Sequence, residues 1–161
     1  MSLLRRRTRP SEGALMFSEI VVGTDGSDTA TGAVALAVDL AQRCAASLHL
    51  VSAYRDPATS VAVAHTGVVA VPDPGFTAFE VRSACEELLT EVSKRVAPIP
   101  VTTHAVPGAP ADVLINVAES VDADLIVVGS RGMKGARRLI GSVPNSVAHR
   151  SPCHVMIAKT T

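Results

Sequence analysis

The sequence predicts a single doubly wound α/β domain, with a five-stranded parallel sheet and helices on both of its faces. Short aliphatic runs alternate with segments of helical apolar spacing in the order βαβαβαβαβ. The runs are apolar throughout, as expected for strands that are buried on both faces. Right-handed crossovers favour the strand order 3-2-1-4-5, in which ligands bind where the chain reverses direction between strands one and four.

The first half of the chain supplies two strands and one helix. Residues 19–25 are predicted as a strand that ends in turn residues, after which Ser27 and Asp28 offer caps for a helix over residues 29–45. Residues 47–54 form the second strand. Residues 55–75 contain three prolines and two glycines, and we expect them to form a long loop near the mouth of a ligand site.

The second half continues the alternation. Strands are predicted at residues 101–106, 124–130 and 153–159, and helices at residues 76–97, after Gly108, and at residues 142–150. Pro110 suits the first turn of the third helix, where a missing N–H costs little. The apolar face of the second helix is predicted to consist of Val81, Cys85, Leu88, Val92 and Val96.

Composition excludes several classes of protein. The chain of 161 residues has 15 Lys and Arg against 15 Asp and Glu, and only 2% aromatic residues. It therefore has neither the basic field nor the stacking side chains that nucleic-acid binding favours. No apolar run approaches the roughly 18 to 20 residues of a membrane helix. Cys44, Cys85 and Cys153 follow no pairing pattern, so we expect core residues and a cytoplasmic location.

Residues 1–16 are expected to be a disordered basic tail or a mis-assigned start, because they carry four arginines and one glutamate. Met16, directly before the first strand, is the alternative start. Residues 17–161 form the predicted domain.

The unusual residues follow strands one and four. The first segment is Gly23-Thr24-Asp25-Gly26-Ser27, and the second carries Gly129, Gly132, Gly135 and Gly141 before Ser142. Glycine lets backbone N–H groups approach phosphate oxygens, and a helix start adds unpaired donors, so this pattern predicts a phosphate site. Ser142 could donate to a phosphate oxygen or to bound Mg²⁺. Four cations lie in the same loop: Arg131, Lys134, Arg137 and Arg138.

Two alternatives stay open from the residues alone. The glycines could mark turns in a surface loop whose cations are solvated. Asp25 could accept hydrogen bonds from a ribose hydroxyl or an adenine amine, or it could be a turn residue that caps the first helix.

The segments VVGTDGS, LHLVSAY, ADLIVVGSRG and GSVPNSVAHRSPCHVMIAK resemble successive landmarks of the universal stress protein family, over residues 17–159. The ATP-binding branch of that family carries a Gly-x2-Gly-x9-Gly-Ser/Thr signature. This sequence is similar to it at Gly129, Gly132, Gly141 and Ser142, although its second gap holds eight residues. The resemblance implies that ATP binds, with or without Mg²⁺, and that cyclic AMP is a weaker alternative ligand.

The resemblance also implies which residues bind. Asp25 and the backbone of Gly23 and Thr24 would meet the base or ribose, and Ala53 would line the adenine pocket. The ribose and phosphates would be held by Val128, Gly129, Arg131, Gly132, Met133, Gly141, Ser142 and Val143. A homodimer is expected through the edge strand at residues 153–159, which runs from Cys153 to Lys159.

No catalytic residue and no metal site is predicted. The sequence shows no Walker or GxSxG motif and no HxxxH spacing among its five histidines. We therefore expect a nucleotide-responsive stress protein that binds with little turnover, at most slow ATP hydrolysis. The rival is a nucleotide-free dimeric interaction module of the same fold. Flavodoxins and response-regulator receivers share this fold class. Asp25 after strand one would repel a flavin phosphate, and strand three ends in Pro107 and Gly108, where a receiver needs an aspartate.

Overall fold

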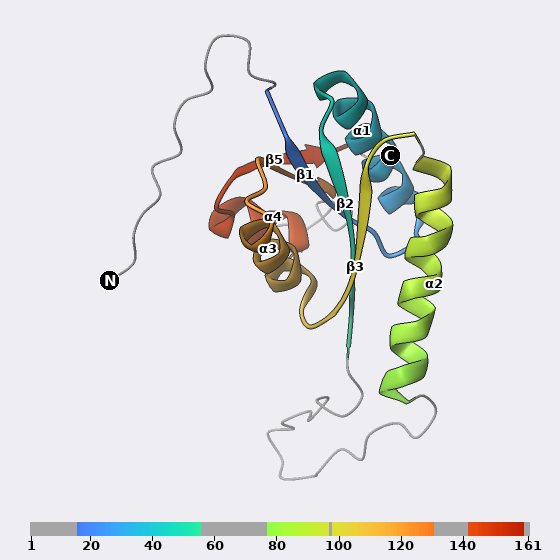
Figure 1. The fold of residues 1–161 in the computed structure, drawn as a ribbon. Helices are drawn as coiled ribbons and strands as arrows, with labels where there is room; N and C mark the ends of the chain where they lie inside the picture. Colours follow the sequence, from blue (N-terminus) through green and yellow to red (C-terminus); the bar gives the residue numbers. More distant parts are fainter. Residues whose placement is uncertain (1–15, 56–76, 97, 131–141, 160–161) are drawn as a thin grey trace.

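A computed structural model of the chain describes residues 16–55, 77–96, 98–130 and 142–159 (Figure 1). Strands and helices alternate along these residues, as the apolar spacing predicts. The elements are β1 (Glu19–Gly23), α1 (Asp28–Cys44), β2 (Ser47–Tyr54), α2 (Ala78–Val96), β3 (Val101–Pro107), α3 (Pro110–Ser120), β4 (Leu125–Gly129), α4 (Val143–Arg150) and β5 (His154–Ala158).

The five strands form one parallel sheet in the order β3-β2-β1-β4-β5. This confirms the predicted fold class and strand order. β1 lies between β2 and β4, and the chain winds first toward β3 and then back toward β5. The carboxyl ends of β1 and β4 therefore diverge into different connections, which is the point where doubly wound proteins bind ligands.

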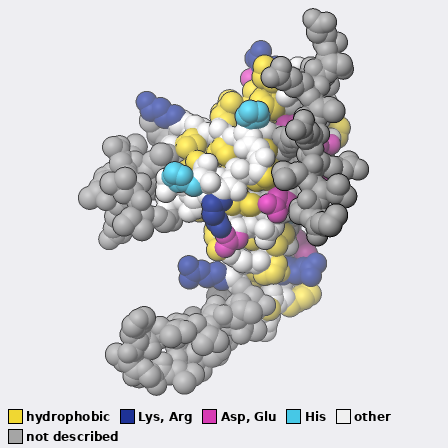
Figure 2. All heavy atoms as spheres, turned by 90° about the vertical axis from the view of Figure 1, so that its left-hand side faces the viewer, with side chains coloured by type: hydrophobic (Ala, Val, Ile, Leu, Met, Phe, Trp, Pro, Cys, Tyr) yellow, Lys and Arg dark blue, Asp and Glu magenta, His cyan; other side chains and the backbone are white. Residues whose placement is uncertain are grey.

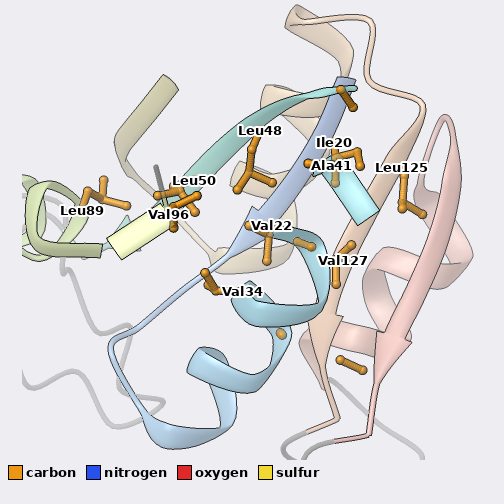
Figure 3. Close-up of a cluster of buried hydrophobic side chains, with 14 residues drawn as sticks. Ile20, Val22, Val34, Ala41, Leu48, Leu50, Leu89, Val96, Leu125 and Val127 are labelled. Carbon is orange, nitrogen blue, oxygen red and sulfur yellow. The ribbon is translucent and has the colours of Figure 1, made fainter. Parts of the chain in front are cut away.

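Helices cover both faces of the sheet (Figure 1). Successive side chains of a strand point to opposite faces of the sheet, so each strand contributes side chains to two apolar layers. In β1, Ile20 and Val22 belong to the cluster that packs with α1 and α2, whereas Val21 belongs to the cluster that packs with α3. Figure 3 shows the first of these clusters, whose larger members are Leu, Ile and Val side chains from the sheet together with Leu and Val side chains from the two helices. Aliphatic packing thus replaces the aromatic residues that the chain lacks.

Side-chain caps define where the helices begin. Ser27 Oγ accepts from Ala30 N–H at the start of α1, and Ser142 Oγ accepts from Asn145 N–H at the start of α4. Before α2, Thr77 and Glu80 form a reciprocal capping box: the Thr77 N–H donates to Glu80 Oε2 at 2.7 Å, and the Glu80 N–H donates to Thr77 Oγ1 at 3.2 Å. Pro110 occupies the first turn of α3, as predicted.

The predicted apolar face of α2 turns toward the core, where Val96 is buried and Val92 packs against the first cluster, but this face is covered only in part. The buried residues of α2 are Leu89 and Val96, whereas Val81, Cys85, Leu88 and Val92 are half-buried. The reason is its position, because α2 packs against β2 and the edge strand β3 and so has neighbours on fewer sides than a central helix.

The three cysteines also depart from their prediction as core residues. Each is half-buried and none forms a disulfide. Cys44 and Cys153 pack at the margins of the two apolar clusters. Within the described residues, no helix is both long and apolar enough to cross a membrane.

Candidate functional site

A cavity of about 240 Å³ lies at the carboxyl ends of β1 and β4. Its walls come from the central strands and from the first turns of three helices. The lining residues are Gly23, Thr24, Asp25, Ser27, Thr29, Ala30, Val51, Ala53, Pro110, Leu114, Val128, Gly129, Val143 and Pro144.

The structure brings together most of the predicted site residues that it describes. Gly23, Thr24, Asp25, Ala53, Val128, Gly129 and Val143 all line the cavity. Ser142 caps α4 directly before Val143. The remaining predicted residues lie outside the described part of the chain: Arg131, Gly132, Met133 and Gly141, together with the loop residues Lys134, Gly135, Arg137 and Arg138.

Sequence reasoning missed the contributions of α1 and α3. Ser27, Thr29 and Ala30 line the cavity from the first turn of α1, and Pro110 and Leu114 line it from α3. The contribution of α1 could have been predicted from the strand order, because this helix starts directly after β1 at the point where the chain reverses direction. The α3 contribution depends on how that helix crosses the sheet.

The turn after β1 is held by short-range hydrogen bonds. The Thr24 N–H donates to the Val51 carbonyl at 2.8 Å and so extends the pairing of β1 with β2. The Gly26 N–H donates to Thr24 Oγ1 at 3.3 Å. Gly26 has a φ of +75°, and a Cβ at this position would lie 3.0 Å from Leu88 Cδ1. The turn therefore requires glycine both for its left-handed backbone and for its close approach to α2.

Asp25 and Ser27 share a hydrogen-bonded turn at the cavity wall. Both the Ser27 N–H, at 3.0 Å, and the Ser27 hydroxyl, at 2.5 Å, donate to Asp25 Oδ1. Ser27 Oγ in turn accepts from the Ala30 N–H. Ser27, and not Asp25, is thus the cap of α1, so the capping alternative for Asp25 is wrong. Asp25 serves the turn by holding Ser27.

The hydroxyl protons in this turn can be assigned. The Ser27 hydroxyl donates its hydrogen bond to the Asp25 carboxylate, which can only accept. The Thr29 hydroxyl, 3.0 Å from Ser27 Oγ, must therefore be the donor in that contact. The chain of donors runs from Thr29 through Ser27 to Asp25 and fixes the polar wall of the cavity.

The cavity combines an apolar wall with the positive ends of helices. Val51, Ala53, Leu114 and Val128 supply the aliphatic surface. Residues of the first turns of α1, α3 and α4 also line it, and each helix N-terminus presents unpaired N–H groups and a positive dipole end. This arrangement suits a ligand that has an apolar ring and an anionic end.

Both signs of charge occur on the surface outside the cavity (Figure 2). On the face shown in Figure 2, the basic and acidic side chains of the described residues are interspersed. Arg150 of α4 pairs with Asp112 of α3 at 2.6 Å, which ties the two helices together across their surface. The described residues contain no group of three His, Cys, Asp or Glu side chains that could hold a metal ion.

Fold and cavity together define a doubly wound α/β protein with a cavity at the reversal of strand order. The chain belongs to the universal stress protein family, whose model matches residues 16–159. This confirms the family that the landmark segments resemble.

Known proteins of this family align over nearly the whole chain. The chain is 32% identical to universal stress protein YxiE of Bacillus subtilis over 149 residues, which cover 89% of this chain and 100% of that protein. It is 34% identical to universal stress protein Rv1636 of Mycobacterium tuberculosis over 149 residues, covering 90% and 98%. Among solved structures, a universal stress protein in complex with cAMP matches with a TM-score of 0.68 and 32% identity, covering 88% of this chain and 95% of that one.

Proposed function

We propose that the cavity binds an adenine nucleotide and that ATP is its main ligand. The observation that carries this proposal is the convergence of the first turns of α1, α3 and α4 on one cavity with an aliphatic wall. Phosphate groups suit helix N-termini, and an adenine ring suits the surface formed by Val51, Ala53 and Val128. The similar universal stress protein that was solved with cAMP supports a nucleotide of this class.

Each part of the nucleotide has a proposed partner. Ala53 and Val128 contact the base, and Asp25 accepts hydrogen bonds from the ribose or the base. The phosphates lie toward the start of α4, where Ser142 keeps its hydroxyl proton free to donate while its oxygen accepts from Asn145. Gly129, Gly132 and Gly141 let the backbone approach the phosphates. Arg131, Met133, Val143 and the backbone of Gly23 and Thr24 complete the proposed site.

We further propose that the nucleotide is bound with little turnover. Phosphoryl transfer needs a positioned base and carboxylates that hold Mg²⁺. Among the described lining residues, Asp25 is the only one with an ionisable side chain, and its Oδ1 already accepts two hydrogen bonds from Ser27. Incubation with ATP and Mg²⁺ at several protein concentrations should release phosphate only slowly. Fast release that Asp25→Ala does not reduce would contradict both the low turnover and this account of the site.

We propose that the protein acts in the cytoplasm as a homodimer, with the edge strand β5 as the dimer seam. β5 pairs with β4 on one side, and Ile157 remains 36% exposed. An aliphatic edge strand with open backbone groups favours pairing with a second chain. The same feature supports the rival function, a dimeric interaction module without nucleotide. Sedimentation of the wild type and of Ile157→Lys tests the seam under both proposals.

Calorimetry separates the two functions. The purified protein should first be denatured to release any bound small molecule, and the refolded protein titrated with ATP, cAMP and GTP. Saturable binding of ATP that exceeds binding of GTP would support an adenine-nucleotide function, and the ratio of ATP to cAMP affinity would show which phosphate pattern is preferred. Dimerisation with no binding of any of the three would favour the interaction module.

A further inference from the structure

Three polar side chains outside the cavity form a hydrogen-bonded cluster across β1, β2 and β3. His49 Nε2 lies 2.8 Å from Glu19 Oε2, and His49 Nδ1 lies 3.0 Å from His104 Nε2. The two imidazole rings have centroids 5.2 Å apart. We call Glu19, His49 and His104 the imidazole cluster. None of these residues lines the cavity.

The imidazole cluster crosses the sheet obliquely on the side of α3. Glu19 opens β1, whereas His104 of β3 lies level with Val51 of β2 and Gly23 of β1. His49 lies between these two levels. The cluster therefore runs from the start of β1 to the row of residues that also lines the cavity.

The hydrogen bonds assign the protons of both rings. An ionised Glu19 carboxylate can only accept, so His49 Nε2 must carry a proton. The Nδ1 of a neutral His49 is then an acceptor, and His104 Nε2 must donate to it. With both rings neutral, each histidine is thus the Nε2–H tautomer. This assignment of protons matters because His49 is only 8% exposed, so its ring nitrogens depend on Glu19 and His104 for their hydrogen bonds.

We propose that Glu19, His49 and His104 bind one proton as a single unit, with the proton held on His49 between the Glu19 carboxylate and a neutral His104 ring. A proton from water binds to His104 Nδ1, and the His104 Nε2 proton moves to His49 Nδ1. His49 then donates from both nitrogens, to Glu19 and to His104. The positive charge lies beside a carboxylate, and no hydrogen bond of the cluster is lost.

A second proton would disrupt the imidazole cluster. It would give both rings a positive charge and place two N–H groups opposite each other at 3.0 Å. Burial lowers the pKa of His104, and the charge of His49 lowers it further. The second proton therefore binds to the cluster at lower pH than the first, and it breaks the contact between the β2 and β3 side chains.

Other acidic side chains lie near the imidazole cluster and could compete with Glu19 for the positive charge. Asp124 accepts from the backbone N–H groups of Ser18 and Glu19 and so lies near the acidic end of the cluster. On α3, which covers this side of the sheet, Asp112 is paired with Arg150 and Glu119 is exposed. A metal ion is a weaker occupant, because the facing ring nitrogens already bond to each other and, within the described residues, no group of three His, Cys, Asp or Glu side chains could hold a metal ion.

Nitrogen-15 NMR of the histidine rings in the full chain tests the proposal. Above the first protonation step, both His49 and His104 should give the spectrum of the Nε2–H tautomer. On acidification the signals of both rings should change in the same two steps. An Nδ1–H tautomer for His104 at high pH, or two rings that titrate independently, would overturn the proposal.

Variants distinguish the shared proton from two ordinary histidines. Glu19→Gln removes the charge beside the proton, so the first step should require a lower pH. His104→Gln keeps an amide donor for His49 Nδ1 and should leave His49 with a single step. His149→Gln changes an exposed histidine of α4 and is the matched control, expected to leave both steps unchanged. Identical titration of wild type and Glu19→Gln, with both chains folded by circular dichroism, would also contradict the proposal.

Discussion

The Ser27 hydroxyl donates to the Asp25 carboxylate at 2.5 Å while its oxygen caps α1. One side chain thus fixes both the start of the helix and the orientation of the carboxylate at the cavity wall. Replacement of Ser27 should therefore affect stability and ligand binding together. A variant at Asp25 leaves the Ser27 cap in place and so tests ligand binding separately.

Ser27→Ala should lower the free energy of unfolding by about 1 kcal/mol, because the first turn of α1 loses its side-chain acceptor. Ser27→Thr keeps the hydroxyl and is the matched control. Urea unfolding of the three proteins measures the effect. Equal stability of wild type and Ser27→Ala would show that the hydrogen bond to Ala30 contributes nothing.

Asp25→Asn should weaken ATP binding without reducing helix content. The substitution keeps the size of the side chain and one oxygen for Ser27, but it removes the negative charge that strengthens hydrogen bonds from a ribose or an amine. Calorimetry and circular dichroism on the same sample measure both quantities. Unchanged affinity would restrict Asp25 to its role in the turn.

Two glycine-to-alanine substitutions should change the stability of the protein in opposite directions. Gly26→Ala should destabilise the protein by about 1 kcal/mol or more, because a left-handed backbone and the neighbouring Leu88 side chain both oppose a Cβ. Gly32→Ala lies at an exposed position inside α1 and should stabilise by about 0.5 to 1 kcal/mol. Thermal unfolding compares them. Stabilisation by both alanines would contradict the close approach of Gly26 to α2.

The low pKa of His104 should make stability depend on pH. Below the ordinary value of 6.5 the unfolded chain binds a proton that the folded chain resists, so the free energy of unfolding falls as the pH drops. Above that value this contribution is fully present. His104→Gln should show a shallower fall between about pH 7 and pH 5. Denaturant unfolding across this range measures the slope, and equal slopes would exclude His104 as its source.

The capping box before α2 should act in a lower pH range. The Thr77 backbone N–H, with the Thr77 hydroxyl, lowers the pKa of Glu80 below its ordinary value of 4.5. A depressed carboxyl pKa stabilises the folded state above 4.5, and this contribution is lost as the pH falls through the folded pKa. Glu80→Gln should remove that part of the acid sensitivity. Unfolding curves on both sides of pH 4.5 test it, with Glu87→Gln on the exposed face of α2 as the control.

Local patterns predicted the elements of this fold well, because continuous aliphatic runs such as residues 125–128 have few alternatives to a strand covered on both faces. Helix starts were also readable. Ser27 was predicted as a cap of the first helix, and its hydroxyl oxygen accepts from the Ala30 N–H there. The sequence could not predict that Leu89 is buried and Leu88 only half-buried, because this depends on how an edge helix is rotated against the sheet.

The site was predictable where it follows strand ends and not where it depends on register. Gly23, Asp25 and Gly129 come directly after or at the ends of β1 and β4, so the strand order placed them together. The contact of His49 with His104 joins residues 55 positions apart in sequence. It arises only because β2 and β3 pair in one register and both side chains then face α3.

The central claim is that the cavity at β1 and β4 holds the adenine nucleotide, and calorimetric titration of Ala53→Phe with ATP tests it most directly. Ala53 is a half-buried residue of the cavity wall, whereas Ala84 is exposed on α2 and gives a matched Ala84→Phe control. Because a phenyl ring would fill the space assigned to the base, Ala53→Phe should lose at least about tenfold in ATP affinity, about 1.4 kcal/mol. Ala84→Phe should bind ATP as the wild type does. Wild-type affinity in a folded Ala53→Phe protein would contradict the assignment of this cavity.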